Sequence, residues 1–289
     1  MFDTAILVLL YNKEIEKSNT INSLVTSNCL FENSKILIWN NGPNSIKEDG
    51  VIPLLDLGYE VEIKETLNNE SLSVIYNEFI DSIKSDKYII LDDDSALSSD
   101  FITAAAKSDV DIVSFPFITS QEVIVYPKVD NLAINKKTKL NDESNLKTIG
   151  SGIVLGNQIC QKLKEYYGSI FDERFYFYGV DSTLCLRLKE LQLISKIKLI
   201  DGFEHSMSRF EKESEEVSHF RKVERSYDFG LTLKYYYPKK KAFFEILMYM
   251  IMTFKRKLLK QPTEFSFFLI VKSFLTGKHY RNVSHGKKT

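Results

Sequence analysis

Cysteine is scarce in this chain of 289 residues, which has only Cys29, Cys160 and Cys185, far apart and without a CxxC pair. This spacing excludes a disulfide framework and a zinc–cysteine cluster, and it favours a reducing compartment. Long apolar runs are also lacking. The longest, residues 242–254, is interrupted by Glu245 and falls short of the roughly 18 apolar residues that a membrane-spanning helix needs. We therefore expect a soluble, cytoplasmic protein.

Net charge is almost absent from the whole chain, at −1, but it is unevenly distributed. Residues 1–233 hold 25 Lys and Arg against 37 Asp and Glu, a net charge of −12. Residues 234–289 hold 13 Lys and Arg against Glu245 and Glu264, a net charge of +11. An acidic body joined to a basic tail predicts that the tail meets an anionic surface. With 44% hydrophobic and 27% charged residues, disorder and a fibrous fold are excluded.

Short apolar runs alternate with segments of helical period through the first half of the chain. This alternation is the signature of βα units that build a mostly parallel sheet. The turn Asn40-Asn41-Gly42-Pro43 closes the second strand. The pattern predicts strands at 4–10, 35–39, 59–63, 87–91 and 110–114, and helices at 14–26 and 71–83.

The middle of the chain departs from this pattern. Residues 115–150 indicate a strand pair followed by a long flexible excursion through the polar stretch 135–145. Loops of that length in compact enzymes are often lids over a site. Beyond it the pattern predicts a strand at 148–155 and helices at 157–167, 181–191 and 211–225.

Three consecutive acids, Asp92, Asp93 and Asp94, follow the predicted strand that ends at residue 91. In an open α/β sheet, ligands bind at the carboxyl ends of the strands. If the backbone stays extended, Asp92 and Asp94 point to the same side, where two carboxylates repel each other unless a cation lies between them. Mg or Mn, which prefer oxygen ligands, would suit this position. The alternative is a solvated acidic turn that caps the helix starting near Ser99.

Two further residues are candidates for chemistry. Asp181 opens a helical stretch after five aromatic residues, so its carboxylate is expected to be partly desolvated and tuned to accept a proton; the alternative is a plain helix cap. His205 follows a strand-like segment, and a neutral imidazole suits a third ligand for a Mn-type ion. The alternative for His205 is an ordinary polar surface residue.

Taken together, these segments resemble the family-2 glycosyltransferases, which are inverting nucleotide-sugar enzymes with the GT-A fold, and especially the bacterial polysaccharide and rhamnosyltransferase-like branch. The resemblance covers about residues 4–210. Its most specific piece is the aromatic run, Gly179, Asp181 and the later LCLR of the segment 171–190. The other pieces follow the family's order: YNK at 11–13, NNG at 40–42, NESLSVIYN at 69–77, LDDDSAL at 91–97, GSGIVLGNQI at 150–159, and His205.

The resemblance implies an α/β, Rossmann-like GT-A domain over residues 1–233, with basic, apolar helices in residues 234–289. It implies that Asp181 is the catalytic base. It also implies that Asp94 and Asp92 hold a divalent metal, Mn or Mg, with His205 as a further ligand. The remaining donor-site residues are expected to be Tyr11 near the base, Asn40 at the base or ribose, and Asn12, Asn77, Asp92 and Asp93.

The sequence departs from the family's pattern at three positions. Asn40 stands where Asp is common, which removes a charge that would help to recognise the base. Ser71 stands where Gly is usual. Val180 replaces the Glu that usually precedes the base, so one acceptor-side carboxylate is missing.

The implied reaction is metal-dependent, inverting transfer of a hexosyl or deoxyhexosyl group from a nucleotide-diphosphate sugar to a hydroxyl of a glycan or lipid-linked acceptor, in cell-surface polysaccharide synthesis. The alternative is a non-catalytic carbohydrate-binding or scaffold protein on a degenerate glycosyltransferase fold. A phosphotransferase of the haloacid dehalogenase type also uses DxD after a strand. Its motif closes the first strand, however, whereas this triplet closes about the fourth.

The basic tail contains two apolar segments flanked by Lys and Arg, residues 239–260 and 264–281. Such segments fit helices that lie in lipid headgroups, which predicts peripheral association with the inner face of the cell membrane. The alternative is a pair of helices packed on the catalytic domain or on a second subunit of a homo-oligomer. Nucleic acid is disfavoured because the basic residues alternate with aliphatic ones and do not line a polar face.

Overall fold

The structure, a computed structural model, describes residues 1–205 and 214–282, which form two compact units. The sheet unit consists of residues 1–70, 74–171 and 184–205, and the helical unit of residues 71–73, 172–183 and 214–282. Two helices, α3 (Leu72–Ser82) and α6 (Val180–Glu190), begin in the helical unit and end in the sheet unit.

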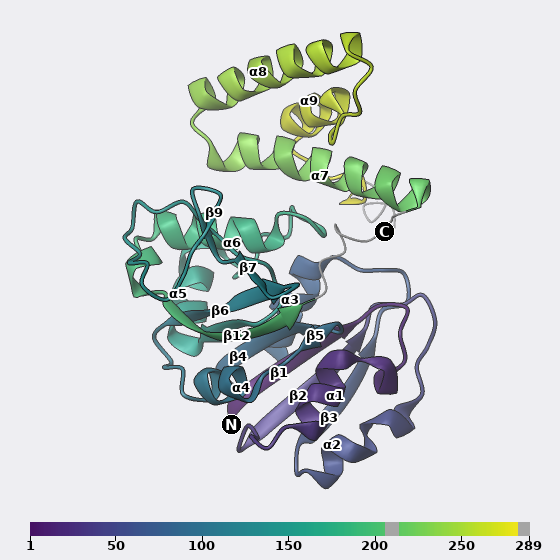
Figure 1. The fold of residues 1–289 in the computed structure, drawn as a ribbon, viewed down its shortest axis with the longest axis vertical. Helices are drawn as coiled ribbons and strands as arrows, with labels where there is room; N and C mark the ends of the chain where they lie inside the picture. The colour runs from purple at the N-terminus through teal and green to yellow at the C-terminus, as the bar shows by residue number, and fades with distance from the viewer. Residues whose placement is uncertain (206–213, 283–289) are drawn as a thin grey trace. The chain divides into compact units, whose positions relative to one another are not determined.

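A mixed sheet forms the centre of the sheet unit (Figure 1). Its strands are β1 (Phe2–Leu10), β2 (Ser34–Asn40), β3 (Glu60–Glu65), β4 (Ser85–Asp92), β5 (Ser95–Ala96), β6 (Val113–Ser120), β7 (Val123–Tyr126), β11 (Ile153–Gly156) and β12 (Lys198–His205). The described strands follow the order β3-β2-β1-β4-β11-β6-β12-β5, and β7 pairs with β6. The first four strands are parallel, β11 is antiparallel to both its neighbours, and β12 is parallel to β6. This sheet confirms the predicted α/β fold class.

Strand register brings the ends of β1, β2 and β4 to one edge of the sheet. Leu10 pairs with Asn40 across β1 and β2, and Leu9 pairs with Asp92 across β1 and β4. The polar residues that follow these strands therefore gather at the carboxyl edge, where open α/β sheets bind ligands.

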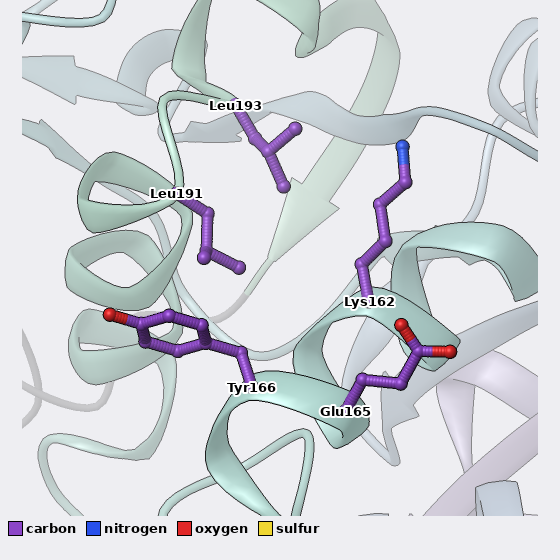
Figure 2. A pocket seen from close by; sticks show the side chains of 5 residues that line it. All are labelled: Lys162, Glu165, Tyr166, Leu191 and Leu193. Atoms are coloured by element: carbon purple, nitrogen blue, oxygen red, sulfur yellow. The ribbon is translucent and has the colours of Figure 1, made fainter.

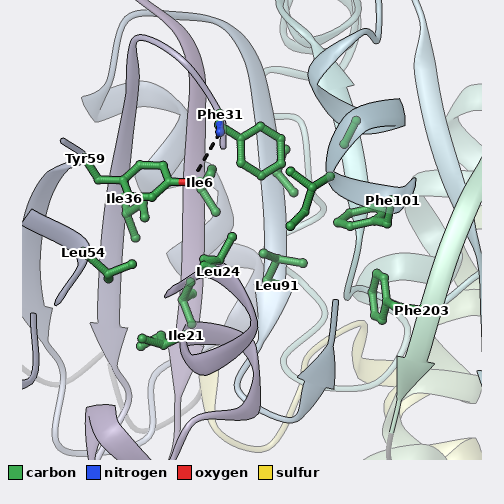
Figure 3. Packing of buried hydrophobic residues seen from close by; sticks show 14 of the residues in the cluster. Ile6, Ile21, Leu24, Phe31, Ile36, Leu54, Tyr59, Leu91, Phe101 and Phe203 are labelled. Carbon is green, nitrogen blue, oxygen red and sulfur yellow. Dashed lines mark hydrogen bonds between the residues drawn. The ribbon is translucent and has the colours of Figure 1, made fainter. Parts of the chain in front are cut away.

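The core explains why the strand predictions at 4–10, 35–39 and 87–91 are confirmed. The prediction at 59–63 is confirmed by the edge strand β3, whose residues are exposed or partly buried. Strands of a parallel sheet covered on both faces are continuous apolar runs, and β1 is buried from Thr4 to Leu10. Figure 3 shows part of the cluster that packs on one face, including Ile6, Ile36 and Leu91. At its margin the Phe31 backbone N–H donates to the Tyr59 hydroxyl at 3.3 Å (Figure 3).

Helices and short 3₁₀ turns connect the strands. Their bounds are Ile15–Lys17 (3₁₀), α1 (Asn19–Thr26), Glu48–Val51 (3₁₀), α2 (Ile52–Asp56), α4 (Ser99–Ala106), α5 (Asn157–Tyr167) and Ile194–Lys196 (3₁₀). Helices α3, α5 and α6 confirm the predictions at 71–83, 157–167 and 181–191. The single helix predicted at 14–26 is wrong, because Ser18 ends the 3₁₀ turn and caps α1, its Oγ accepting from the Ile21 N–H at 3.2 Å.

Two strand predictions are displaced. The strand expected at 110–114 begins at Val113, because the carbonyls of Val110 and Ile112 accept hydrogen bonds from the backbone N–H groups of Gln158 and Gly156. The strand expected at 148–155 begins at Ile153, after a turn in which Gly152 has a φ of +87°. Both boundaries depend on chain segments that are distant in sequence.

The polar stretch 135–145 connects strands of a small second sheet, formed by β8 (Lys128–Val129), β9 (Leu132–Ala133) and β10 (Leu146–Lys147). It is held by several hydrogen bonds. The Asp142 carboxylate accepts from the backbone N–H of Ser195 at 2.9 Å and from its hydroxyl at 3.0 Å. Lys189 donates to the Glu143 carbonyl at 2.7 Å. The excursion predicted here as flexible is therefore bonded to α6 and to the segment after it, and its role as a lid stays a prediction.

The helical unit contains α7 (Glu215–Tyr236), α8 (Lys239–Leu258) and α9 (Phe267–Thr276), shown in green to yellow in Figure 1. The helix predicted at 211–225 is α7, which continues to Tyr236; residues 211–213 lie outside the described residues. The predicted domain boundary after residue 233 falls within α7 and stays a prediction. In the described part of the chain, no helix has the length and apolar character of a membrane span.

Replacing Gly230 by Ala is expected to destabilise the helical unit by about 2 kcal/mol, because overpacked cores cost this much. A Cβ at Gly230 would lie 1.9 Å from Ser273 Oγ and 2.4 Å from the Ile270 carbonyl oxygen, so α7 and α9 would have to separate. Urea denaturation followed by circular dichroism measures the loss. Ser218→Ala, on the exposed part of α7, is the control and should change stability little. Equal stability of both variants would show that α7 and α9 do not approach this closely.

Candidate active site

The acidic triplet lies where β4 ends. The backbone N–H of Asp92 donates to Ser151 Oγ at 3.0 Å, and its carbonyl accepts from the hydroxyl of Thr20. The backbone carbonyl of Asp93 accepts from Ser18 Oγ at 3.0 Å. Hydroxyl groups from α1 and from the turn before β11 therefore fix the backbone of the triplet.

Asp92, Asp94 and His205 come together as a cluster. Each offers a ligand atom, and these atoms lie within 4.8 Å of one another. The register of β12 on β5 causes this meeting, because His205 pairs with Ser95. His205 Nδ1 lies 3.2 Å from Asp94 Oδ1 and 3.1 Å from Ser95 Oγ. This geometry would permit the three residues to bind one metal ion, as predicted.

The electrostatics of the cluster favour a bound cation. Burial raises the pKa of Asp94, although the neighbouring His205 opposes this, and burial lowers the pKa of His205. Asp94 Oδ1 is buried and, apart from the nearby His205 ring, accepts no hydrogen bond from the residues that the structure describes. A buried carboxylate oxygen without a donor is costly, and a divalent cation would satisfy it. Two carboxylates and a neutral imidazole are a donor set that suits Mn²⁺.

Asp93 points to different partners. Its carboxylate forms an ion pair with Lys13 and accepts from the backbone N–H of Tyr11 at 3.3 Å. It therefore orders the loop after β1, in which Asn12 adopts a left-handed conformation with φ of +51°. The Tyr11 side chain is half exposed. Its placement leaves it accessible to a ligand at this edge of the sheet.

Asn40 is buried at the end of β2, with its hydrogen-bonding groups used inside the protein. Its amide nitrogen donates to the Asn44 carbonyl at 2.7 Å and to Glu65 Oε1 at 2.8 Å. Its side-chain oxygen accepts from the backbone N–H of Gly42 at 3.0 Å. The hydrogen bond from Asn40 is the main cause of a lowered pKa of Glu65, followed by one from the backbone of Ile46. Asn40 thus shapes the loop that follows β2.

That loop and the loop after β1 line a hollow of about 330 Å³. It lies at the carboxyl ends of two parallel strands. Its lining is polar and charged apart from one isoleucine, and consists of Asn12, Lys13, Glu14, Lys17, Asn44, Ser45 and Ile46.

Replacing Asn40 by Asp is expected to destabilise the protein by about 2 kcal/mol, because a carboxylate would face Glu65 and the Asn44 carbonyl would lose its donor. The double variant Asn40→Asp/Glu65→Gln restores a donor for the new carboxylate and should recover at least half of the loss. Thermal denaturation of the wild type, both single variants and the double variant measures this coupling. Additive effects would show that residues 40 and 65 do not interact.

Asn77 on α3 is also committed to a structural contact. Its amide nitrogen donates to the Phe171 carbonyl at 2.9 Å, and its oxygen accepts from the Phe171 N–H at 2.9 Å. These two bonds anchor the start of the aromatic segment. Both polar groups of the Asn77 side chain are therefore engaged in this contact. Its role in donor binding stays a prediction.

Asp181 lies in the first turn of α6, one residue after the helix begins at Val180, so it is not the residue before the helix that a plain cap requires. Its Oδ1 accepts from the backbone N–H of Ser182 at 2.7 Å. Burial raises the pKa of Asp181 to about 6, against the weaker effect of its hydrogen bonds with Ser182. A carboxylate with this pKa is largely ionised at neutral pH and still basic enough to take up a proton.

The segment before Asp181 is tightly held. Gly179 has a φ of +83°, and a Cβ there would lie 1.9 Å from Asp228 Oδ1, so Gly is required for the approach to α7. Burial alone would raise the pKa of Asp172, but hydrogen bonds from Arg174 and Tyr236 outweigh it and hold that pKa below its ordinary value.

The end of the described chain contacts the same aromatic segment. The Arg281 guanidinium lies over the rings of Tyr176 and Phe177, at 5.2 and 4.8 Å from their centroids. Buried Glu224 of α7 lies 3.2 Å from both His279 Nε2 and Arg281 Nε. Sequence reasoning missed this network, as it missed Ser95, Ser151 and Thr20 around the cluster, because isolated hydroxyl and charged residues carry no distinctive pattern.

A second hollow, of about 420 Å³, lies in the sheet unit away from every predicted site residue. Figure 2 shows Leu191 and Leu193, from the segment after α6, facing Lys162, Glu165 and Tyr166 of α5. Its lining holds a single carboxylate, Glu165, and neither histidine nor cysteine, so we assign it no chemistry.

No family model matches the chain, and no curated protein sequence matches it. Among solved structures, residues 1–349 of TarS from S. aureus match with a TM-score of 0.50 at 10% identity, over 80% of this chain and 64% of that one. The same TarS fragment in complex with UDP-GlcNAc matches with a TM-score of 0.49 at 11% identity, over 80% and 66%. The mannosyltransferase PcManGT from Pyrobaculum calidifontis, in complex with GDP-Man and Mn²⁺, matches with a TM-score of 0.49 at 8% identity, over 79% and 62%.

The chain therefore spans somewhat less than two thirds of each of these structures. At this level of identity the likeness concerns the fold. Together with the strand order and the position of the acidic triplet, it confirms the prediction of a GT-A fold.

Proposed function

We propose that this protein is a metal-dependent glycosyltransferase that moves a sugar from a nucleotide-diphosphate donor to a hydroxyl acceptor. The observation that carries the proposal is the convergence of Asp92, Asp94 and His205 at the carboxyl end of β4 within a GT-A fold. TarS, whose fold this chain shares, is seen with UDP-GlcNAc, which supports a nucleotide sugar as donor.

The donor site is assigned to the sheet unit. Asp92, Asp94 and His205 would hold a divalent cation, Mn²⁺ or Mg²⁺, which when bound supplies Lewis-acid stabilisation of the departing diphosphate. Asn12 and the hollow between the loops after β1 and β2 would receive the base and ribose, with Tyr11 beside them. Asp93 and Asn40 position these loops, and in this way they would contribute to donor binding indirectly.

Asp181 is assigned the role of general base. Its carboxylate takes the proton of the acceptor hydroxyl as that oxygen forms a bond to the anomeric carbon. The bond from that carbon to the phosphate oxygen breaks, and its electron pair leaves with the nucleoside diphosphate. A single displacement of this kind inverts the anomeric centre and requires one base and no covalent intermediate, as in the family-2 glycosyltransferases that the sequence resembles.

The biological setting belongs to the same proposal. We infer transfer of a hexosyl or deoxyhexosyl group in bacterial cell-surface polysaccharide synthesis, to a glycan or lipid-linked acceptor at the inner face of the cell membrane. Residues 1–233 would form the catalytic domain and residues 234–289 the membrane-associating region.

Incubation with a panel of UDP-, GDP- and dTDP-sugars and Mn²⁺ tests the proposed function. At least one donor is expected to raise the melting temperature, because a ligand that binds the folded state stabilises it, and to be hydrolysed slowly without an acceptor. Stabilisation without hydrolysis or transfer, for any donor and for glycan or lipid-linked acceptors, would favour the alternative of a carbohydrate-binding scaffold. If no donor raises the melting temperature and none is hydrolysed, the proposal that the donor is a nucleotide sugar is contradicted.

A further inference from the structure

Helix α8 exposes an unusual amount of apolar surface. Its middle stretch, 242–254, contains a single charged residue, Glu245. Several of its large side chains are more than half exposed, including Phe243 at 70% and Phe254 at 65%. The exposed apolar residues of α8 and its C-cap are Phe243, Phe244, Leu247, Met248, Met250, Ile251, Met252, Phe254, Leu258 and Leu259. An exposed apolar surface of this extent marks an interaction site.

Packing within the helical unit uses one narrow stripe of α8. Within this helix, which the structure describes in full, Ala242 alone is buried. Ile246 and Tyr249 are partly buried beside it, against Leu233 of α7 and Ile270 of α9. A helix that is apolar on nearly all sides normally lies in a protein core or in lipid. The exposed sides of α8 therefore lack a protein partner among the described residues.

The charges of α8 indicate which partner covers it. Lys239, Lys240 and Lys241 begin the helix. Lys255, Arg256 and Lys257 end it, and Lys260 follows. The apolar stretch between these clusters is about 20 Å long at 1.5 Å per residue. Two cationic ends around an apolar middle match a helix lying flat at the boundary between anionic headgroups and acyl chains.

A second copy of the chain fits this surface poorly. In either a parallel or an antiparallel pair of α8 helices, the Lys and Arg clusters of the two copies would face each other at both ends. Glu245 is the one acidic residue of α8 that could offset them. Like charges at close range destabilise such a pair, whereas an anionic bilayer attracts both clusters at once.

We propose that α8 is the membrane-docking element of this protein, lying in the plane of an anionic bilayer with Phe244 and Ile251 buried among the lipids. Helix α9 also exposes apolar side chains. Phe268 and Leu275, two helical turns apart, are both strongly exposed. The proposal rests on the proposed function only in that a lipid-linked acceptor gives the docking its purpose; the docking itself follows from exposure and charge.

Flotation of the full chain with vesicles tests the proposal. The protein is expected to float with vesicles of phosphatidylcholine and phosphatidylglycerol and far less with phosphatidylcholine alone. Phe244→Glu/Ile251→Glu should reduce the lipid partition coefficient at least about tenfold, because it places charges in the apolar face. Lys255→Gln/Lys257→Gln/Lys260→Gln should reduce it by about 100-fold on anionic vesicles, since each basic residue near the surface contributes to attraction. Val123→Glu, an exposed apolar position in β7, is the matched control and should float like the wild type.

Three outcomes would overturn the proposal. One is failure of the wild type to float with anionic vesicles, and another is flotation of the Phe244→Glu/Ile251→Glu variant equal to that of the wild type. The third is a dimer in sedimentation velocity that this variant dissociates, which would assign the surface to a second copy. Hydrolysis of a soluble donor should be unchanged in the docking variants, so a failure of docking and a failure of the proposed catalytic function are measured separately.

Discussion

Replacing Asp181 by Asn is expected to lower kcat for sugar transfer by about 10³-fold, because general-base catalysis contributes on this order. The Asn side chain keeps the oxygen that accepts from the Ser182 N–H, so the start of α6 should be preserved. Binding of the nucleotide donor should be unchanged, since the residues assigned to it lie in the sheet unit. Transfer rates, together with calorimetric titration of the donor, measure the two effects.

The pH dependence of the wild type tests the same residue. Burial raises the pKa of Asp181 to about 6, and the base acts only as the carboxylate. Activity should therefore rise with pH through about 6 and level off above it, with about one tenth of the base ionised at pH 5. The residual activity of Asp181→Asn should lose this rise. A variant with full turnover, or one that keeps the wild-type pH profile, would remove Asp181 from the mechanism.

Replacing Asp94 by Asn is expected to weaken binding of Mn²⁺ by at least about 100-fold, because even groups that only support a metal ligand contribute 10- to 100-fold. The buried Asp94 Oδ1 is the atom of the cluster with the clearest need for a cation. Titration of Mn²⁺ followed by electron paramagnetic resonance measures the affinity directly, and chelation should abolish transfer by the wild type. His205→Gln, which removes the imidazole from the cluster, should also weaken binding.

Asp93→Asn is the matched control for this prediction. Asp93 is adjacent in sequence, but its carboxylate pairs with Lys13 and the Tyr11 N–H and lies outside the cluster. Its replacement should leave Mn²⁺ affinity close to that of the wild type. If Asp93→Asn and Asp94→Asn weaken the ion equally, the cluster of Asp92, Asp94 and His205 is not the metal site.

Strands β1, β2 and β4 of the parallel half of the sheet could be predicted from the sequence because each contains a continuous apolar run followed by polar residues. Edge strand β3 could be predicted from its alternation of apolar and charged residues. The position of Asp92 and Asp94 followed from the same pattern. The approach of His205 could not be derived from spacing, since it depends on the pairing of β12 with the two-residue strand β5. That strand has no recognisable pattern of its own. The local sequence left His205 either as a metal ligand or as a polar surface residue, and the resemblance to a family favoured the ligand.

The hydrogen-bond partners of isolated polar residues were the least predictable part of the site. Asn40 and Asn77 match positions that the resemblance assigns to the donor, yet their amide groups bond to Glu65 and Phe171 inside the protein. Only the folded chain shows that these partners are within reach. Arg281 is a similar case, because a basic residue of the tail lies over aromatic rings from the segment before Asp181.

The central proposal is that Asp92, Asp94 and His205 hold a cation that binds the donor's diphosphate. Calorimetric titration of the full chain with UDP, GDP and dTDP, in the presence and absence of Mn²⁺, tests it most directly. At least one nucleotide is expected to bind tightly with Mn²⁺ and weakly without it, and Asp94→Asn should lose this difference. Nucleotide binding of equal strength with and without Mn²⁺, or none with any of the three, would contradict the proposal.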